Sequence, residues 1–267
     1  MYWVDGKLTD TIAVADRSFQ YGDGCFTTML TRYGRIQHWT QHRERMEQAL
    51  VALGLPKPDW NQVQACLASA CDTSPQAGLK LHVSAGAGGR GYSRPECVTP
   101  TVTISRFAYP QHYKQWMETG VRLGLCEQKL ALNPMLAGHK HNNRLEQVLL
   151  KAEMEKTDFA DGLVLDLNHN VVETTAANVF WVKGSTLYTP DLNLSGVAGV
   201  MRRVVLAQAS EQGLCVEIGA FPLSAVESAD EIFMTNSLLQ LAPVIQIQDH
   251  HFSIGPITRL LQESITS

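Results

Sequence analysis

Two tight turns near the start of the chain restrict its fold more than any other feature. Asp5 and Gly6 stand between two short strand-like runs, and Gly34 lies within "CFTTMLTRYGRIQHW". Asp-Gly favours a type I′ turn, and a glycine between two β-prone runs also favours a turn, so both segments are predicted to form β-hairpins. Hairpins in place of regular strand–helix–strand units favour an α+β fold over a doubly wound parallel sheet.

The remaining elements follow from apolar periodicity and capping residues. A helix is expected from about Thr40, a plausible N-cap, to Leu53, with Gly54 at its end, and Asp59 caps a second helix. Strands are expected at 78–85, 98–107 and 121–126, and a β-rich stretch at 162–188. Further helices are expected from about 142 to 156, from 199 to 212 and from about 256.

The segment "AYPQHYKQWMETG" (108–120) differs in texture from its surroundings. It is polar and aromatic, contains a proline and has no clear period. It is therefore predicted to be an interdomain linker between a smaller α+β domain at 1–107 and a larger α+β domain at 121–267.

Composition excludes several classes of protein. The formal net charge of -4 argues against a nucleic-acid binder. No apolar run approaches the roughly 18 residues of a membrane span, and the N-terminus does not resemble a signal peptide. The cysteines form no C-x-x-C pair, so they are predicted to be reduced and mostly buried in a cytoplasmic protein. They are Cys25, Cys66, Cys71, Cys97, Cys126 and Cys215.

The stretch "GAGGRG" (86–91) matches the G-x-G-x-x-G pattern of dinucleotide-binding proteins. That site needs a helix opening at the glycines and an acidic residue about 20 positions later. Pro95, Pro100 and another predicted strand follow instead, which argues against a Rossmann site. Two interpretations of Arg90 stay open: it meets a carboxylate of a ligand, or it lies in a flexible surface hairpin.

Basic side chains crowd into "GHKHNNR", where Lys140 stands between His139 and His141 and four residues before Arg144. A metal site is not predicted, because no third ligand matches these histidines or the Asp249–His251 run, and Lys140 would repel a cation. Lys140 is either a solvated lysine before a helix or a Schiff-base lysine. A Schiff-base amine must spend time neutral, and burial and nearby cations favour that form.

A second set of residues suits pyridoxal phosphate. Glu173, in the apolar run 171–182, is a candidate to hold the pyridine nitrogen protonated. The expected helix N-terminus at 199–201 offers free backbone N–H groups to a phosphate. Arg45 and the segment 234–238 are candidates for further donors.

In this order and spacing, the motifs resemble the fold-type IV pyridoxal phosphate enzymes, the group of the branched-chain and D-amino acid aminotransferases. The likeness covers essentially the whole chain and includes "DRSFQYGDGCFTT" (16–28), "HRERM" (42–46), "GHKHNNRLEQ" (138–147), Glu173 with Asn178, and "GVMR" (199–202). With "GGRGYS" (88–93), the lysine segment points to the aminodeoxychorismate lyases within that group.

The resemblance implies roles for individual residues. Lys140 is the Schiff-base lysine and the catalytic residue, and Glu173 is the partner of the pyridine nitrogen. Arg45, the backbone of Val200 and Met201, and Asn236 bind the phosphate. The family more often has an apolar residue at position 139 and leucine at position 142, where this chain has histidine and asparagine.

The resemblance further implies a two-domain D-amino acid aminotransferase-like fold, a homodimer, and a cofactor near the domain interface. The implied reaction converts 4-amino-4-deoxychorismate to 4-aminobenzoate and pyruvate for folate synthesis, with a possible functional link to aminodeoxychorismate synthase. Two rivals remain: an aminotransferase of the same fold acting on D- or branched-chain amino acids, and a non-catalytic binding protein.

Overall fold

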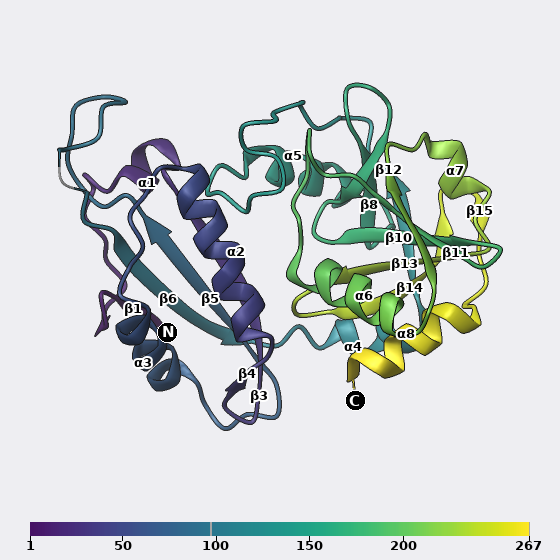
Figure 1. The fold of residues 1–267 in the computed structure, drawn as a ribbon, viewed down its shortest axis with the longest axis horizontal. Helices are drawn as coiled ribbons and strands as arrows, with labels where there is room; N and C mark the ends of the chain where they lie inside the picture. Colours follow the sequence, from purple (N-terminus) through teal and green to yellow (C-terminus); the bar gives the residue numbers. More distant parts are fainter. Residues whose placement is uncertain (97, 267) are drawn as a thin grey trace. The chain divides into compact units, whose positions relative to one another are not determined.

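The computed structural model describes residues 1–96 and 98–266, and the chain divides into two compact units (Figure 1). The smaller unit contains Met1–Pro110 and His139–Arg144, and the larger contains Gln111–Gly138 and the chain from Leu145 onward. The expected linker at 108–120 holds helix α4 (His112–Thr119), whose Tyr113, Trp116 and Met117 pack on the core of the larger unit. The α+β class is confirmed.

Both predicted hairpins form in the smaller unit. The strands β1 (Tyr2–Val4) and β2 (Lys7–Leu8) are joined by Asp5 and Gly6, which have φ values of 48° and 78°. The strands β3 (Gly24–Arg32) and β4 (Arg35–Ile36) are joined by Tyr33 and Gly34, again with positive φ. With β5 (Ala77–Ser84) and β6 (Thr101–Ala108), they form a six-stranded sheet in the order β2-β1-β6-β5-β3-β4.

The helices α2 (Trp39–Ala52) and α3 (Trp60–Ala70) lie on one face of this sheet (Figure 1). Asp59 caps α3 as predicted, because its side chain accepts hydrogen bonds from the N–H groups of Asn61 and Gln62. The Thr40 cap was wrong: α2 begins one residue earlier, after His38 in the left-handed conformation, and has no side-chain cap. A short helix, α1 (Arg17–Tyr21), was not predicted.

Strand alternation gives this sheet two different faces. Leu79, Leu81 and Val83 of β5 are buried in the core formed with α2 and α3, whereas Lys80 and His82 alternate with them and project from the opposite face. That opposite face therefore presents polar groups, which is important for the site described below.

A nine-stranded sheet forms the larger unit, in the order β12-β11-β10-β13-β14-β7-β8-β9, with β15 paired to β14. Its strands are β7 (Val121–Leu125), β8 (Asp161–Leu165), β9 (Val171–Thr174), β10 (Asn178–Lys183), β11 (Thr186–Pro190), β12 (Cys215–Gly219), β13 (Glu231–Asn236), β14 (Gln240–Ile247) and β15 (His250–His251). Its other helices are α5 (Leu145–Met154), α6 (Val200–Glu211), α7 (Leu223–Glu227) and α8 (Pro256–Thr266).

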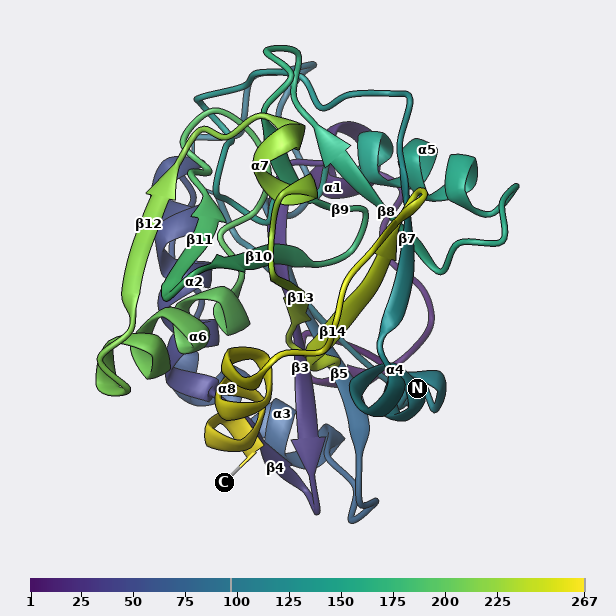
Figure 2. The ribbon, with the colours of Figure 1, turned by 90° about the vertical axis from the view of Figure 1, so that its right-hand side faces the viewer.

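Helices cover both faces of the larger sheet. The helices α6 and α8 pack side by side (Figure 2) and bury Phe180, Phe233 and Leu261. The other face buries Trp181 and Met234 against α4 and α7. Because strand residues alternate between these two cores, β10 and β13 are almost wholly buried.

Five cysteines in the described part of the chain are free thiols, in agreement with the reduced state predicted from the sequence. Cys25 and Cys126 are buried, Cys66 and Cys71 are half-buried, and Cys215 is exposed; Cys97 lies outside the described residues. Across residues 1–96 and 98–266, no helix is both long and apolar enough to cross a bilayer.

Candidate active site

The lysine segment runs as a short strand along the edge of β3. The N–H of Phe26 donates to the carbonyl of Lys140 at 3.0 Å, and the N–H of Asn142 donates to the carbonyl of Gly24 at 2.9 Å. Cys25 and His141 form the bridge between these two bonds. This pairing delays the following helix, so α5 begins at Leu145 and not near Asn142. The backbone of Lys140 is therefore fixed by the sheet.

The Lys140 side chain lies over an aromatic ring, with its Nζ 4.9 Å from the ring centroid of Phe26. Arg144 turns back on the segment: its Nε donates to the carbonyl of His141 at 2.9 Å and its Nη2 to that of His139 at 3.2 Å. The arginine thus closes a loop around the lysine with charge-assisted hydrogen bonds.

The spacing of the two flanking histidines suggests additional positive charge beside Lys140, but both imidazoles have lowered pKa values. Burial is the main cause of the lowered pKa of His141, which falls to about 4, and the charges of Arg144, His139 and Lys140 add to it. Burial also lowers the pKa of His139. Both imidazoles are therefore mostly neutral at pH 7. The two histidines therefore add little positive charge beside Lys140.

Asn142, where the family more often has leucine, is a hydrogen-bonding residue. Its Nδ2 donates to Oγ of Ser18 at 2.7 Å, and that Oγ lies 3.4 Å from Nε2 of His82. A Cβ at Gly24 would lie 2.5 Å from the same Nδ2, so only glycine lets the segment approach. The polar side chain therefore ties the lysine segment to α1 and β5.

Arg45 reaches the same stretch of β3 from helix α2. Its Nη2 donates to Oγ1 of Thr27 at 2.5 Å, and Thr27 Oγ1 lies 2.6 Å from Nδ1 of His42. Burial lowers the pKa of Arg45 to about 10, which still leaves the guanidinium charged at pH 7. Its buried Nε has no hydrogen-bond partner among the described residues. A buried cation with an unsatisfied donor suits an anionic ligand.

In the larger unit, Glu173 organises the turn that precedes α6. It lies in β9, is buried, and its Oε2 accepts a hydrogen bond from the N–H of Val197 at 3.0 Å. Asn178 secures the same turn: its Nδ2 donates to the carbonyl of Val197, and its Oδ1 accepts from the N–H of Gly199. The carboxylate predicted from the sequence is therefore held rigidly beside the start of a helix.

Helix α6 begins one residue beyond Gly199, as predicted. Gly199 is the N-cap and gives no side-chain cap, so the first N–H groups, those of Val200 and Met201, have no acceptor within the helix. A Cβ at Gly199 would come 2.2 Å from Oδ1 of Asn178, so only glycine allows this turn. Free N–H groups and the positive end of the helix dipole make this a site for an anion.

Asn236, predicted to help bind the phosphate, lies at the end of β13. Its Oδ1 accepts hydrogen bonds from the N–H groups of Leu238 and Leu239, and its Nδ2 donates to the carbonyl of Ala176 at 3.3 Å. The side chain thus builds the turn between β13 and β14.

Arg90 lies at the exposed tip of the glycine-rich loop, whose fold is set by Arg17. The buried guanidinium of Arg17 donates to the carbonyls of Gly88, Gly91, Tyr92 and Ser93. No helix opens at these glycines, and β6 follows instead, in agreement with the sequence argument against a Rossmann site. The hydrogen bonds from Arg17 therefore hold the loop in place, with Arg90 exposed.

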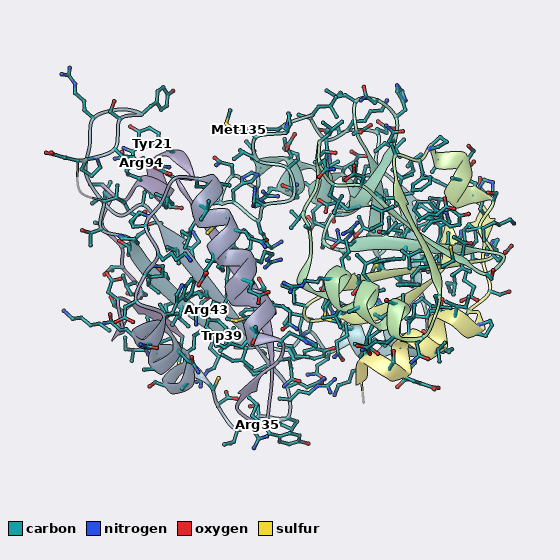
Figure 3. The ribbon with its side chains drawn as sticks, viewed as in Figure 1. Tyr21, Arg35, Trp39, Arg43, Arg94 and Met135 are labelled. Carbon is teal, nitrogen blue, oxygen red and sulfur yellow. The ribbon has the colours of Figure 1, made fainter. Side chains whose placement is uncertain are left out.

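An ion-pair network anchors the base of this loop. Asp23 binds both Arg17 and Arg94, which is labelled in Figure 3. Arg17 also lies over the ring of Tyr21, and that ring packs edge-on against Tyr92. Burial alone would raise the pKa of Asp23, but the two guanidinium groups more than offset it, so the pKa lies below its usual value. The carboxylate is therefore ionised at neutral pH.

A groove elsewhere in the smaller unit is a poor candidate for the phosphate site. A groove of about 490 Å³ beside α2 is lined by Glu44, Glu47, Lys57 and His139. Two carboxylates disfavour a phosphate there. Among the described residues, no three or more His, Cys, Asp or Glu side chains are grouped to hold a metal ion.

Sequence reasoning missed several residues that shape the site. Phe26 and Thr27 lie within a quoted motif, but nothing in the sequence shows that they contact Lys140 and Arg45. The carbonyl bonds of Arg144 and Arg17 also depend on tertiary folding. Among these residues, Asn178 could be recognised from the sequence, because its position five residues after Glu173 is part of the family resemblance.

A class IV amino-transferase family model matches residues 24–247. The chain belongs to this family. It is 49% identical to the aminodeoxychorismate lyase of Vibrio harveyi over 100% of both chains. It also resembles the crystal structure of 4-amino-4-deoxychorismate lyase from Pseudomonas aeruginosa, at 36% identity and a TM-score of 0.92, covering 99% of this chain and 97% of that one.

The fold is shared more widely within the class IV family. The branched-chain amino acid aminotransferase of Escherichia coli matches with a TM-score of 0.87 at 19% identity, covering 99% of this chain and 92% of that one. Class IV enzymes depend on pyridoxal phosphate. The residues present fit that cofactor, because the orphaned donor of buried Arg45 and the free N–H groups at α6 both suit a phosphate.

Proposed function

We propose that this chain is a pyridoxal phosphate-dependent lyase that converts 4-amino-4-deoxychorismate to 4-aminobenzoate and pyruvate. The observation that carries the proposal is the fixed position of Lys140, paired to β3 and held over Phe26, in a chain so similar to enzymes of that name. A non-catalytic binding protein would have no need of a lysine held in this way.

Four groups are proposed to hold the cofactor. Lys140 would bind it covalently through its amine, and the carboxylate of Glu173 would hold its ring nitrogen protonated. Arg45 and the N–H groups of Val200 and Met201 bind its phosphate. When bound, the cofactor supplies a ring that accepts electrons from the substrate.

Lys140 is proposed to act as the base in the reaction. With its amine free, Lys140 would remove the proton from C4 of the substrate ring. The C3–O bond then breaks, enolpyruvate leaves and becomes pyruvate on protonation, and the ring becomes aromatic. Arg144 assists by holding the carbonyls on either side of Lys140, which fixes the position of the amine.

Asn236 is proposed to act on the phosphate indirectly. Its side-chain oxygen holds the N–H groups of Leu238 and Leu239, so it shapes the turn after β13 that would face the phosphate. Arg90 is proposed to meet one of the two substrate carboxylates, since the guanidinium fork matches a carboxylate well.

The remaining proposals concern the setting of the enzyme. We expect a homodimer in the cytoplasm. The free cysteines suit a reducing compartment, and the exposed apolar side chains of Leu8, Ile12, Val14 and Phe19 would suit burial against a second copy. A synthase that makes aminodeoxychorismate would be the functional neighbour. Light scattering after size-exclusion chromatography would give the mass of the assembly.

One assay separates the lyase from its rival, an aminotransferase on the same fold. Purified protein loaded with pyridoxal phosphate is incubated with aminodeoxychorismate and no amino acceptor. The lyase releases equal amounts of 4-aminobenzoate and pyruvate over many turnovers. An aminotransferase stops after a single turnover and resumes only when a keto acid is added, which would overturn the proposal.

A further inference from the structure

A second lysine shares the aromatic ring on which Lys140 rests. Lys80, in β5, places its Nζ 4.3 Å from the centroid of the Phe26 ring, and the Nζ of Lys140 lies 4.9 Å from the same centroid. The two amines therefore cannot be farther apart than the sum of these two distances. A group bonded to Lys140 thus lies within the neighbourhood of Lys80.

The surroundings of Lys80 offer hydroxyl groups but no opposite charge. Its cross-strand neighbours on the same face are Thr28 in β3 and Ser105 in β6. His82, two residues along β5, has its pKa lowered to about 4, chiefly by burial, and is neutral at pH 7. Within residues 1–96 and 98–266, no carboxylate lies within ion-pair distance of Lys80.

A half-buried ammonium without an anion is costly to keep. Burial lowers the pKa of Lys80, because the charged form loses hydration. Contact with the Phe26 ring compensates only in part, since a cation–π contact contributes about 0.5–1 kcal/mol at exposed sites and somewhat more when desolvated. A lysine that served only solubility would extend into solvent, as Lys57 and Lys183 do, each paired with an acid.

Resting on the proposed function, we infer that Lys80 binds one of the two carboxylates of the substrate while the substrate amine reacts beside Lys140. The phosphate has its own donors, Arg45 at Thr27 and the start of α6, so Lys80 is available to a different anion. Phe26 then has two tasks: it limits the movement of both amines and excludes water beside them. Arg90, on the exposed loop, remains available for the other carboxylate.

The test compares Lys80→Met and Lys80→Arg with the wild-type holoenzyme, with Lys183→Met as a matched surface control. Methionine keeps the apolar stem and removes the charge. We expect Lys80→Met to raise the KM for aminodeoxychorismate roughly tenfold or more, about 1.4 kcal/mol of binding, with a smaller change in kcat. Lys80→Arg should restore part of the affinity, and Lys183→Met should behave as wild type.

A second measurement identifies the carboxylate and does not require turnover. The inhibition constants of 4-aminobenzoate and of pyruvate are each measured on wild type and on Lys80→Met. These products carry one each of the two substrate carboxylates, so weaker inhibition by either one assigns Lys80 to that group. Circular dichroism and the cofactor absorbance band establish that the variant is folded and loaded. If it is not, Lys80→Arg and Lys80→Gln take its place.

The inference and the proposed function fail in different ways. If wild-type enzyme releases no 4-aminobenzoate, the proposed function is wrong. If wild type is active and Lys80→Met keeps its KM and both inhibition constants, Lys80 does not bind substrate. If the borohydride-trapped cofactor maps to Lys80 and not to Lys140, the roles of the two lysines are reversed and the inference is also overturned.

Discussion

The smaller and the larger unit each present candidate site residues, and these residues differ in kind. The smaller unit offers charged side chains, Lys140, Lys80 and Arg45, each placed against β3. The larger unit offers Glu173 and the backbone N–H groups at the start of α6, placed by the turn that Glu173 and Asn178 hold. The candidates in the smaller unit are therefore cationic side chains, whereas those in the larger unit are a carboxylate and backbone N–H groups.

The first prediction breaks the smaller unit's contribution altogether. Lys140→Ala removes the amine that we propose binds the cofactor and takes the C4 proton, so we expect nearly all turnover to disappear. Borohydride reduction followed by peptide mass analysis should find no adduct on 139–144. Lys57→Ala, at an exposed lysine paired with Glu47, is the control. An adduct that persists on another residue, such as Lys151, would show that Lys140 was assigned wrongly.

The second prediction breaks the larger unit's contribution while keeping its shape. Glu173→Gln can still accept the N–H of Val197 but removes the negative charge. We expect kcat to fall on the order of 10²-fold, about 3 kcal/mol, with the cofactor still bound. Single-turnover measurement of the C4 proton removal tests this. Normal turnover would mean that the carboxylate serves only to hold the turn before α6.

These two residues also show what the sequence could reveal. Glu173 and Lys140 were chosen as candidates because their chemistry is unusual for their surroundings. The hairpins were found because Asp5-Gly6 and Gly34 are required by local backbone geometry. Such signals are contained within a few consecutive residues, so a single sequence is enough to recognise them.

Other features could not be predicted because they depend on contacts distant in sequence. Helix α5 starts late because 140–142 pairs with the edge of β3, more than a hundred residues earlier. Helix α2 lacks the expected Thr40 cap because His38 turns the chain in the left-handed conformation. The neutral state of His141 follows from burial, which no local pattern shows.

The third prediction tests whether Arg45 binds the phosphate of the cofactor. Arg45→Lys keeps the charge, but one ammonium cannot replace the planar fork that bonds Thr27 and an anion together. We expect the dissociation constant of pyridoxal phosphate to rise roughly tenfold to a hundredfold, by 1.4 to 2.7 kcal/mol. Titration of the cofactor-free protein with pyridoxal phosphate measures it. Unchanged affinity for pyridoxal phosphate would mean that Arg45 does not bind its phosphate and that the N–H groups at the start of α6 are the remaining candidates.

The fourth prediction concerns the exposed loop of the smaller unit. Arg90→Ala should raise the KM for aminodeoxychorismate about tenfold, or 1.4 kcal/mol, and leave the cofactor spectrum unchanged. Arg90→Lys should recover only part of the loss, because an ammonium cannot make the two-pronged contact. Steady-state kinetics distinguish the variants. Normal kinetics for Arg90→Ala would mean that Arg90 is a solvated surface residue that does not bind the substrate.

The smallest expected effect is on the pH dependence of stability, which should differ between the smaller unit, where His82 lies, and the larger unit. The pKa of His82 falls to about 4, mainly through burial and then through the charge of Lys80, with Asp16 acting in the opposite direction. In the unfolded chain a histidine titrates near 6.5. Between pH 6.5 and 4 the unfolded state therefore binds more protons than the folded state. The stabilisation from neutral His82 is complete above pH 6.5 and declines as the pH falls through this window.

Hydrogen exchange at several pH values can measure this decline within each unit. Peptides from β3 and β5 should lose protection, corrected for intrinsic exchange rates, as the pH is lowered from 6.5 to 4.5. His82→Gln, which cannot take up a proton, should make that loss shallower by up to one proton, about 1.4 kcal/mol per pH unit. Peptides from β9 and β10 in the larger unit are the internal reference and should respond equally in both proteins. The same slope for β5 in wild type and variant would mean that His82 is protonated in the folded protein, so that its imidazole adds a positive charge to the face that carries Lys80 and Lys140.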